Sequence, residues 1–455
     1  KLRLYSKRTN LILIIFKEEF KMSIKFKDIV VIGFALFAMF FGAGNLIFPP
    51  FLGVISGTKW FVSFMAFLFA DGGLALLGVI AATGTQGDMM AFFGRAGKKL
   101  GIVIASLTIL CIGPFVAIPR TAATTYEIGI VPNFGHSLSP IVFAIIFFVI
   151  VLVLTIKPSK VVDIIGAFLT PVLLICLAVL IIKGIVSPLG APLDRTLVDN
   201  VFISGINDGY QTLDGMAGAV FAGIVIASVK QKGYTEKKVL VKATILAGIV
   251  AVVGLALVYG GLTYLGATVS PQYDNTVERT TLVISITQAI LGGPGKVILG
   301  LVVGLACLTT AIGLTSACGN YFSDLTEGKL KYEVIVVVVC VFSAIISNFG
   351  VDKIIQIAAP LLYMMYPAVV TLILLGLIHT KIQNKNVYVL ASWVALILGV
   401  AHELSTVPLF AKVGVLASLT EALNKLPGHS VGFYWIIPVL VAAIVGKFIA
   451  AKKEA

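Results

Sequence analysis

The sequence predicts an all-α protein that crosses a membrane about twelve times. Of its 455 residues, 59% are hydrophobic and only 12% are charged, and the mean hydropathy is +1.06. Apolar runs of about 20 residues, the length that crosses a bilayer as a helix, alternate with short polar loops. A soluble domain would be far more polar. The net charge of +13 therefore belongs to membrane loops rather than to a nucleic-acid-binding surface.

The basic residues favour one side of the predicted membrane. With the N-terminus inside, the inner loops and tails hold 24 of the 34 Lys and Arg residues, and the outer loops hold 8. Short cytoplasmic loops of membrane proteins carry such an excess of positive charge. Both termini are therefore expected in the cytoplasm, which agrees with an even number of spans.

Twelve apolar ranges define the expected spans, with an uncertainty of a few residues at each boundary. They are 28–56, 60–82, 101–129, 138–156, 161–184, 202–228, 238–268, 296–323, 333–349, 353–378, 386–403 and 431–450. Three other segments connect them, namely an amphipathic link, a short re-entrant or interfacial helix and an outer amphipathic loop, at 88–99, 276–292 and 408–428.

The first 21 residues differ from the rest of the chain. They are basic and then apolar over too few residues to cross a bilayer, and Met22 reads as a natural start just ahead of the first span. We expect 1–21 to be a non-native or disordered extension and 22–455 to be a single transmembrane domain.

The first span carries a break in its middle. Gly42, Gly44 and Asn45 interrupt it, and Pro49 and Pro50 follow within a turn or two. Glycine weakens a helix, and proline removes a backbone donor. A helix broken at membrane depth offers free N–H groups at one half-helix and free C=O groups at the other, which suit a carboxylate and a small cation. A kink that only shapes packing is an equally supported interpretation of this stretch alone.

A second broken helix is predicted at the sixth span. Its first half is too polar to face lipid, because it carries Asp208, Gly209, Gln211, Thr212, Asp214 and Gly215. A broken span near the start of each half indicates an inverted-repeat transporter whose site lies at the bilayer midplane. The repeats would be 28–184 and 202–378, followed by extra helices within 386–450. The alternative is that 202–215 is the outer end of an ordinary helix.

The eighth span supplies a possible cation site. Ala306, Thr309 and Thr310 share one helical face at i, i+3 and i+4. Two hydroxyls and a free carbonyl are hard oxygen ligands of the kind that Na⁺ prefers. The commoner fate of membrane hydroxyls, however, is to bond their own helix or a neighbouring one.

Three charged residues within spans need separate explanations. Asp71, in the middle of the second span, is either a functional group such as a proton site or a hydrogen-bonded structural residue. Arg120 and Glu127 are seven residues apart and favour a structural ion pair if the helix is regular between them. Arg120 is alternatively a gate that closes against Asp208 or Asp214. The four histidines offer no buried proton relay, which favours Na⁺ over H⁺ as the coupling ion, and no other cofactor is expected.

Four stretches resemble the BrnQ-type branched-chain amino acid:cation symporters. They are 34–53 (FALFAMFFGAGNLIFPPFLG), 113–129 (GPFVAIPRTAATTYEIG), 208–214 (DGYQTLD) and 306–317 (ACLTTAIGLTSA). The match runs from about Met22 to the end of the chain. The resemblance implies a LeuT-like fold of five plus five inverted helices, and uptake of leucine, isoleucine and valine across a bacterial cell membrane, coupled to Na⁺ (or H⁺).

A more distant similarity concerns the first break. Gly42-Ala-Gly-Asn45 followed by Phe48-Pro49 looks like the corresponding break of the neurotransmitter:sodium symporters. This similarity implies that the amides of Gly42, Ala43, Gly44 and Asn45 hold the substrate carboxylate. It also implies a sodium site built by Ala38, Phe41, Ala306, Thr309 and Thr310. Leu46 and Ile47 stand where that family has an Arg, so the outer gate must differ.

The remaining substrate groups are assigned to the sixth span and its neighbours. We expect the ammonium to meet carbonyls and polar groups of Asp208, Gly209, Tyr210, Gln211 and Thr212, with Tyr210 capping the site. An apolar slot for the side chain is expected from Phe41, Met216, Val220 and residues 112–115. Transport of another solute, an intramembrane enzyme and a channel are the alternatives. The spans contain no paired protease-like Asp motif, no metal-spaced His cluster and no recognisable filter.

Overall fold

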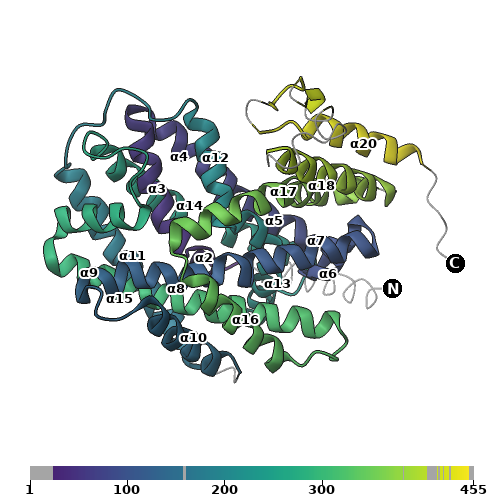
Figure 1. Cartoon of the computed structure of the whole chain (residues 1–455). Helices are drawn as coiled ribbons and strands as arrows, with labels where there is room; N and C mark the ends of the chain where they lie inside the picture. The colour runs from purple at the N-terminus through teal and green to yellow at the C-terminus, as the bar shows by residue number, and fades with distance from the viewer. Residues whose placement is uncertain are drawn as a thin grey trace, which may run out of the picture.

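The computed structural model describes residues 24–156, 160–382, 384–406, 418, 421–423, 425–429 and 432–449, without the side chains of 160–170. Within these ranges every regular element is a helix, as expected (Figure 1). The predictions for 1–21 and for most of the 408–428 loop lie outside the described residues.

The helices of the first half follow the predicted spans. The first span is α2 and α3, the second is α4, η2 and α5, and the third runs from α7 to α9. Single helices α10 and α11 form the fourth and fifth. Their bounds are α2 Phe26–Phe40, α3 Ala43–Ser56, α4 Trp60–Leu68, η2 Phe69–Gly73, α5 Leu74–Ala82, α6 Met89–Phe93 in the amphipathic link, α7 Lys98–Leu110, η5 Cys111–Phe115, α8 Ala117–Thr124, η6 Thr125–Ile130, α9 Val131–Phe134, α10 Pro140–Ile156 and α11 Lys160–Val186.

The second half begins with the bent pair α12 and α13, whose axes differ by 40°. Long helices follow, and α18 and α20 are the last two helices among the described residues. Their bounds are α12 Val201–Thr212, α13 Asp214–Gln231, α14 Lys237–Thr268, α15 Arg279–Leu325, α16 Tyr332–Ser347, α17 Val351–Leu377, α18 Asn386–Thr406 and α20 Ile436–Phe448.

By length and composition, six helical stretches of the described chain qualify as membrane spans, and the bent pair makes a seventh. This is fewer than the predicted twelve, because Ala43–Thr85 joins the second half of the first predicted span to the second span, and four other predicted ranges hold only shorter apolar helices among the residues searched. The shorter apolar helices Pro140–Ile156, Pro171–Val186, Tyr332–Ser347 and Ile436–Phe448 occupy four of those remaining ranges.

The connection at 276–292 differs from its prediction. The expected short helix and the eighth span form one element, α15, with a sharp bend at Gly292. Gly292 has φ +72°, a left-handed conformation that glycine adopts without a steric penalty. The chain therefore turns and resumes its helix without an intervening loop.

Helices of each half pack against helices of the other half. Helix α14 packs against α2 and α3, whereas α4 and α5 pack against α12 and α13. The crossing of α3 and α14 is close enough to require glycine. A Cβ on Gly53 would lie 2.0 Å from Thr263 O, and one on Gly266 would lie 1.9 Å from Pro50 O. Small residues allow such backbone approach in membrane bundles. The paired contacts place the two broken helices side by side at the centre.

Candidate substrate site between the two broken helices

The predicted break of the first helix is present. Helix α2 ends at Phe40, Phe41 and Gly42 are extended, and α3 begins at Ala43. The side-chain Oδ1 of Asn45 accepts a hydrogen bond of 2.9 Å from Gly42 N and so caps the new helix. The next amides, at the start of α3, have no acceptor within their own helix. The positive end of α3 therefore faces the centre of the protein.

Asn45 also connects this break to two other helices. Its Nδ2 donates to Asp214 Oδ2 at 2.7 Å and to Tyr259 OH at 2.5 Å. Only 1% of Asn45 is exposed. One side chain thus joins the start of α3 to the first turn of α13 and to the middle of α14.

The second predicted break is at Leu213. Helix α12 ends at Thr212, and α13 begins at Asp214. Leu213 between them has φ +76°, which is unusual for a residue with a side chain. The Thr212 hydroxyl lies 2.7 Å from Asp71 Oδ1. Asp71 is fully buried, and its Oδ2 has no hydrogen-bond partner.

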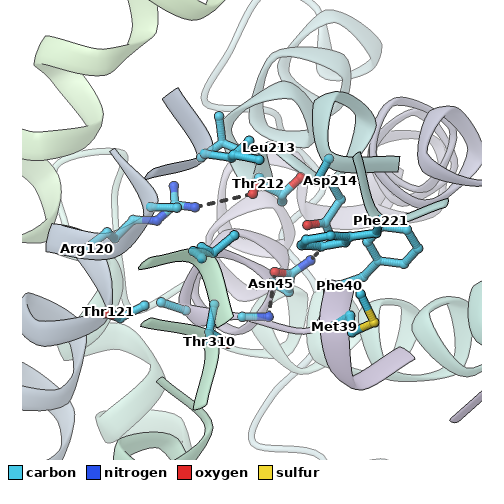
Figure 2. A pocket seen from close by; sticks show the side chains of 16 residues that line it. Met39, Phe40, Asn45, Arg120, Thr121, Thr212, Leu213, Asp214, Phe221 and Thr310 are labelled. Atoms are coloured by element: carbon cyan, nitrogen blue, oxygen red, sulfur yellow. Dashed lines mark hydrogen bonds between the residues drawn. The ribbon is translucent and has the colours of Figure 1, made fainter. Parts of the chain in front are cut away.

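Arg120 from α8 covers the end of α12. Its Nη1 donates to Gln211 O at 2.6 Å. Its Nη2 lies 3.4 Å from Thr212 O, a contact that Figure 2 shows. The last carbonyls of a helix lack partners within the helix and carry partial negative charge, so a guanidinium stabilises them. Arg120 is 3% exposed, and its Nε has no partner.

A small cavity lies where the two breaks meet, as Figure 2 shows. Its volume is about 30 Å³, enough for one or two water-sized groups. A branched side chain can therefore enter only when neighbouring side chains move. The lining residues are Met39, Phe40, Gly42, Ala43, Asn45, Ile112, Ala117, Arg120, Thr121, Thr212, Leu213, Asp214, Ala217, Phe221, Thr310 and Leu314.

The structure brings only part of the expected substrate set to this cavity. Gly42, Ala43, Asn45 and Thr212 line it, and so do Arg120 and Asp214. The other members are not among its lining residues, namely Phe41, Gly44, Asp208, Gly209, Tyr210, Gln211, Met216 and Val220.

Aromatic packing accounts for two of these displacements. Phe41 stacks on Phe37 at 5.3 Å between ring centroids and faces Tyr259 at 6.5 Å. Tyr210 stacks on Tyr366 at 3.9 Å. The Phe41 ring therefore packs between α2 and α14, and the Tyr210 ring packs on α17, so neither lines the cavity.

Some apolar residues that line the cavity were not predicted from the sequence. They are the helical neighbours of the residues that were expected there. Met39 and Phe40 take the place of Phe41, and Ala217 and Phe221 take the place of Met216 and Val220. A helix turns by about 100° per residue, so an error of one position changes the face presented. The sequence contains no signal that fixes this rotation.

The expected sodium ligands are only partly assembled. Thr310 lines the cavity, and a Cβ on Gly42 would lie 3.9 Å from its Cγ2. The Thr309 hydroxyl instead donates to Ala306 O in its own helix at 2.9 Å. The first break and α15 are therefore adjacent, while the Thr309 and Ala306 oxygens bond each other.

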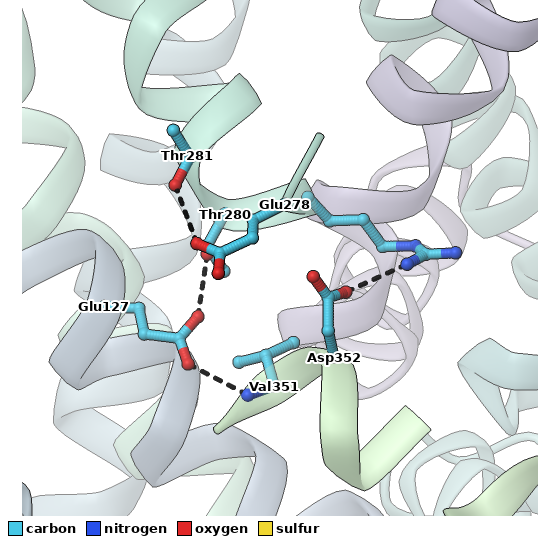
Figure 3. A network of polar contacts seen from close by, with 7 residues as sticks. Glu127, Glu278, Thr280, Thr281, Val351 and Asp352 are labelled. Atoms are coloured by element: carbon cyan, nitrogen blue, oxygen red, sulfur yellow. Dashed lines mark hydrogen bonds and ion pairs between the residues drawn. The ribbon is translucent and has the colours of Figure 1, made fainter. Parts of the chain in front are cut away.

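The predicted ion pair between Arg120 and Glu127 is wrong. Glu127 accepts hydrogen bonds from Thr280 Oγ1 at 2.7 Å and from Val351 N at 2.9 Å (Figure 3). The helix widens at η6, so the seven-residue spacing no longer keeps both side chains on one face. Glu127 joins the starts of α15 and α17 to the third span.

A neighbouring ion pair lies in the same region. Arg279 Nη1 is 2.9 Å from Asp352 Oδ1, and the Arg279 guanidinium lies 4.1 Å from the centroid of Phe51. Glu127, Thr280, Val351, Arg279 and Asp352 together form what we call the α15–α17 polar network. It connects the beginnings of both helices to α3 and η6.

Known proteins resemble this chain over nearly its whole length. Residues 25–453 match the family described as branched-chain amino acid transport protein. The branched-chain amino acid permease BraB of Bacillus subtilis is 37% identical over 94% of this chain and 96% of its own length. The permease BrnQ of Escherichia coli K12 is 32% identical over 92% of this chain and 94% of its own length.

Solved structures show the fold. MhsT in complex with L-phenylalanine has a TM-score of 0.54 and 16% identity, covering 90% of this chain and 98% of that protein. The nucleobase-cation-symport-1 transporter Mhp1 has a TM-score of 0.57 and 14% identity, covering 91% of each chain. The predicted LeuT-like fold is confirmed, and relatives named as permeases agree with transport rather than enzyme chemistry. The chain belongs to the branched-chain amino acid transport protein family.

Proposed function

We propose that this protein imports leucine, isoleucine and valine by symport with Na⁺, using alternating access around the cavity between the two broken helices. The names of the relatives support the substrate class. The observation that carries the coupling is the balance of buried charge at that cavity.

Three ionisable side chains meet at the centre of the molecule. Asp71 is fully buried, Asp214 is 6% exposed and Arg120 is 3% exposed. If all three are ionised, this group carries one negative charge in excess. A zwitterionic amino acid adds no net charge, so the imbalance persists when substrate binds. Because an uncompensated charge in a membrane interior is costly, a monovalent cation is favoured there.

Sodium binding near the first break fits this requirement. Thr310 lies next to Gly42. The carbonyl oxygens at the end of α2, which include the expected ligands Ala38 and Phe41, can bind a cation. Cation binding there would hold the broken first helix against α15. Loss of the cation would release that contact, which is the differential stabilisation that alternating access requires.

Protonation of the carboxylates is the second candidate for the coupling reaction. Asp71 Oδ2 is buried without a partner, and Asp214 is the adjacent acidic side chain. A proton on one of them would also remove the excess negative charge. The two candidates differ in which ion gradient drives accumulation.

The apolar lining supports a preference for branched aliphatic side chains. Met39, Phe40, Ile112, Phe221 and Leu314 border the cavity. An apolar pocket distinguishes side chains that differ by one methylene by only about 1–3 kcal/mol. All three branched-chain amino acids should therefore be transported, with polar amino acids excluded.

Uptake of radiolabelled leucine into sealed liposomes tests this proposal. The protein is given an inward Na⁺ gradient, a K⁺ control or a pH gradient. Thr309→Ala and Thr310→Ala are compared with Thr287→Ala, whose hydroxyl bonds only its own helix in α15. We expect Na⁺-driven accumulation that is reduced in the first two variants. Uptake driven only by pH would move the coupling to Asp71 and Asp214, and no accumulation of leucine would refute the substrate.

A further inference from the structure

Two opposite charges face the central cavity without pairing. Arg120 and Asp214 both line it, and Figure 2 shows them approaching from different helices. Among the ion pairs within 4.0 Å found in the described part of the chain, none joins these two residues. A buried cation and a buried anion on the border of one small cavity form a site complementary to a zwitterion.

The surroundings of Arg120 favour an anion beside it. A Cβ on Gly44 would lie 2.9 Å from Arg120 Nη2, so the guanidinium lies over the first turn of α3. That turn is the positive end of a 14-residue helix. Two positive groups this close together are stabilised by a carboxylate that contacts both of them. The unpartnered, buried Nε of Arg120 supplies a further donor.

The same contacts disfavour two of the carbonyls expected to bind the ammonium. Arg120 already bonds Gln211 O at 2.6 Å and lies 3.4 Å from Thr212 O, so these carbonyls have a cationic partner. Asp214 is the acidic side chain that lines the cavity. Asn45 Nδ2 donates to Asp214 Oδ2 at 2.7 Å, and the carboxyl group of Asp71 lies close enough to interact with it. An ammonium at Asp214 would be attracted by both carboxylates.

We propose that Arg120 and Asp214 form a charge clamp that recognises the two ends of the amino acid. Arg120 and the start of α3 bind the α-carboxylate, and Asp214 binds the α-ammonium. The branched side chain then points to the apolar lining. This inference rests on the proposed function, and it adds the residues that select α-amino acids over compounds bearing only one of the two charges.

Competition binding with three ligands tests the clamp. Purified protein is equilibrated with radiolabelled leucine and challenged with leucine, with leucinol (which lacks the carboxylate) and with 4-methylpentanoate (which lacks the ammonium). We expect wild type to prefer leucine over each analogue by about 30-fold or more, because each analogue leaves one buried charge unpaired.

The variants should lose opposite halves of this preference. Arg120→Gln should weaken leucine binding by about 30-fold or more while leucinol binding changes little, so the preference for leucine over leucinol disappears. Asp214→Asn should have the corresponding effect with 4-methylpentanoate. Arg120→Lys keeps the charge but loses the planar fork, and should retain part of the preference. Because each result is a ratio between ligands, a partial loss of folded protein leaves it unchanged.

Two other variants serve as controls. Arg95→Gln and Glu127→Gln alter partly buried charges that do not line the cavity, and both should keep the wild-type ratios. If wild type binds leucine but Arg120→Gln and Asp214→Asn still prefer leucine over both analogues, the clamp is overturned and the proposed function stands. Wild type that binds no branched-chain amino acid would overturn the proposed function and the clamp with it. If Arg120→Gln does not fold, Arg120→Lys replaces it. The clamp is then overturned if Arg120→Lys prefers leucine over leucinol as strongly as wild type does, and Asp214→Asn prefers leucine over 4-methylpentanoate as strongly as wild type does.

Discussion

The two helix breaks at the centre of this protein are built in different ways. The break between α2 and α3 uses local chemistry, because Gly42 is extended and Asn45, three residues later, caps it. The break between α12 and α13 falls on Leu213 in a left-handed conformation. The carbonyls at the end of α12 are bonded by Arg120, which comes from a different helix. The first break is specified within a few residues, whereas the second depends on tertiary contacts.

This difference suggests a division of roles. A locally capped helix start can keep its geometry while neighbouring helices move. A helix end held by a distant guanidinium changes whenever that side chain finds another partner. A substrate carboxylate that binds Arg120 would therefore alter the hydrogen bonds at the end of α12. Because Asn45 bonds Asp214, a movement of Asp214 would also move the start of α3.

The largest expected effect follows removal of the side chain shared by both breaks. Asn45→Ala removes the cap on Gly42 and leaves Asp214 without its 2.7 Å donor. Leaving a buried charged group unsatisfied costs about 3 kcal/mol or more. We expect loss of leucine uptake and a clear drop in thermal stability. Asn133→Ala is the control, because the Asn133 amide donates only to Gly129 O four residues earlier in the chain. Equal behaviour of the two variants would contradict the account.

A smaller effect is expected from branching the residue at the second break. Leu213→Val removes one methylene, which alone costs about 1 kcal/mol. Valine is also strongly disfavoured at positive φ, so the total cost should reach about 2–3 kcal/mol. Denaturation of the purified protein measures this difference. Leu36→Val, equally buried in regular α2, should cost only the methylene. Equal losses would show that Leu213 carries no conformational constraint.

Two glycines of the first break should respond unequally to alanine. A Cβ on Gly44 would lie 2.9 Å from Arg120 Nη2 and 3.3 Å from Phe48 Cε2, whereas one on Gly42 would meet nothing closer than 3.7 Å. Gly44→Ala should therefore displace the guanidinium and weaken leucine binding about tenfold, or about 1.4 kcal/mol. Gly42→Ala should stay within about twofold of wild type, because alanine accepts an extended backbone. A reversed order in leucine affinity would place Arg120 away from the first break.

Much of this architecture could be predicted from residues that act locally. Gly42, Gly44 and Asn45 predict the first break, and the polar run from Asp208 to Gly215 predicts the second. Both features follow from backbone chemistry in lipid, where a broken helix must be satisfied by protein or ligand. The LeuT-like arrangement followed from the resemblance carried by those stretches.

Other features depend on contacts that spacing does not reveal. The role of Arg120 requires knowing that α8 passes the end of α12, 91 residues away in the chain. Glu127 contacts α15 and α17 because the helix is widened at η6. The ion pair expected between Glu127 and Arg120 requires a regular helix between them. The rotation of α2 and α13, which decides between Phe41 and Phe40 at the cavity, is likewise set by packing.

The smallest predicted effect concerns the α15–α17 polar network, in which Glu127 does not line the cavity. Glu127→Gln keeps the shape of the side chain and one acceptor, but it removes the charge that holds Thr280 Oγ1 and Val351 N. We expect a loss of about 1 kcal/mol of stability and a changed uptake rate at unchanged leucine affinity. Binding and uptake measured on the same preparation separate these quantities. A large loss of affinity would mean that this network belongs to the substrate site.

A structure determined with leucine and Na⁺ bound tests the central claim most directly. The account predicts leucine between the two breaks, with its carboxylate at Arg120 and the start of α3 and its ammonium at Asp214. The side chain should contact Phe40 and Phe221. Leucine bound instead around Asp208 and Tyr210, with Arg120 still bonded only to Gln211 and Thr212, would contradict it.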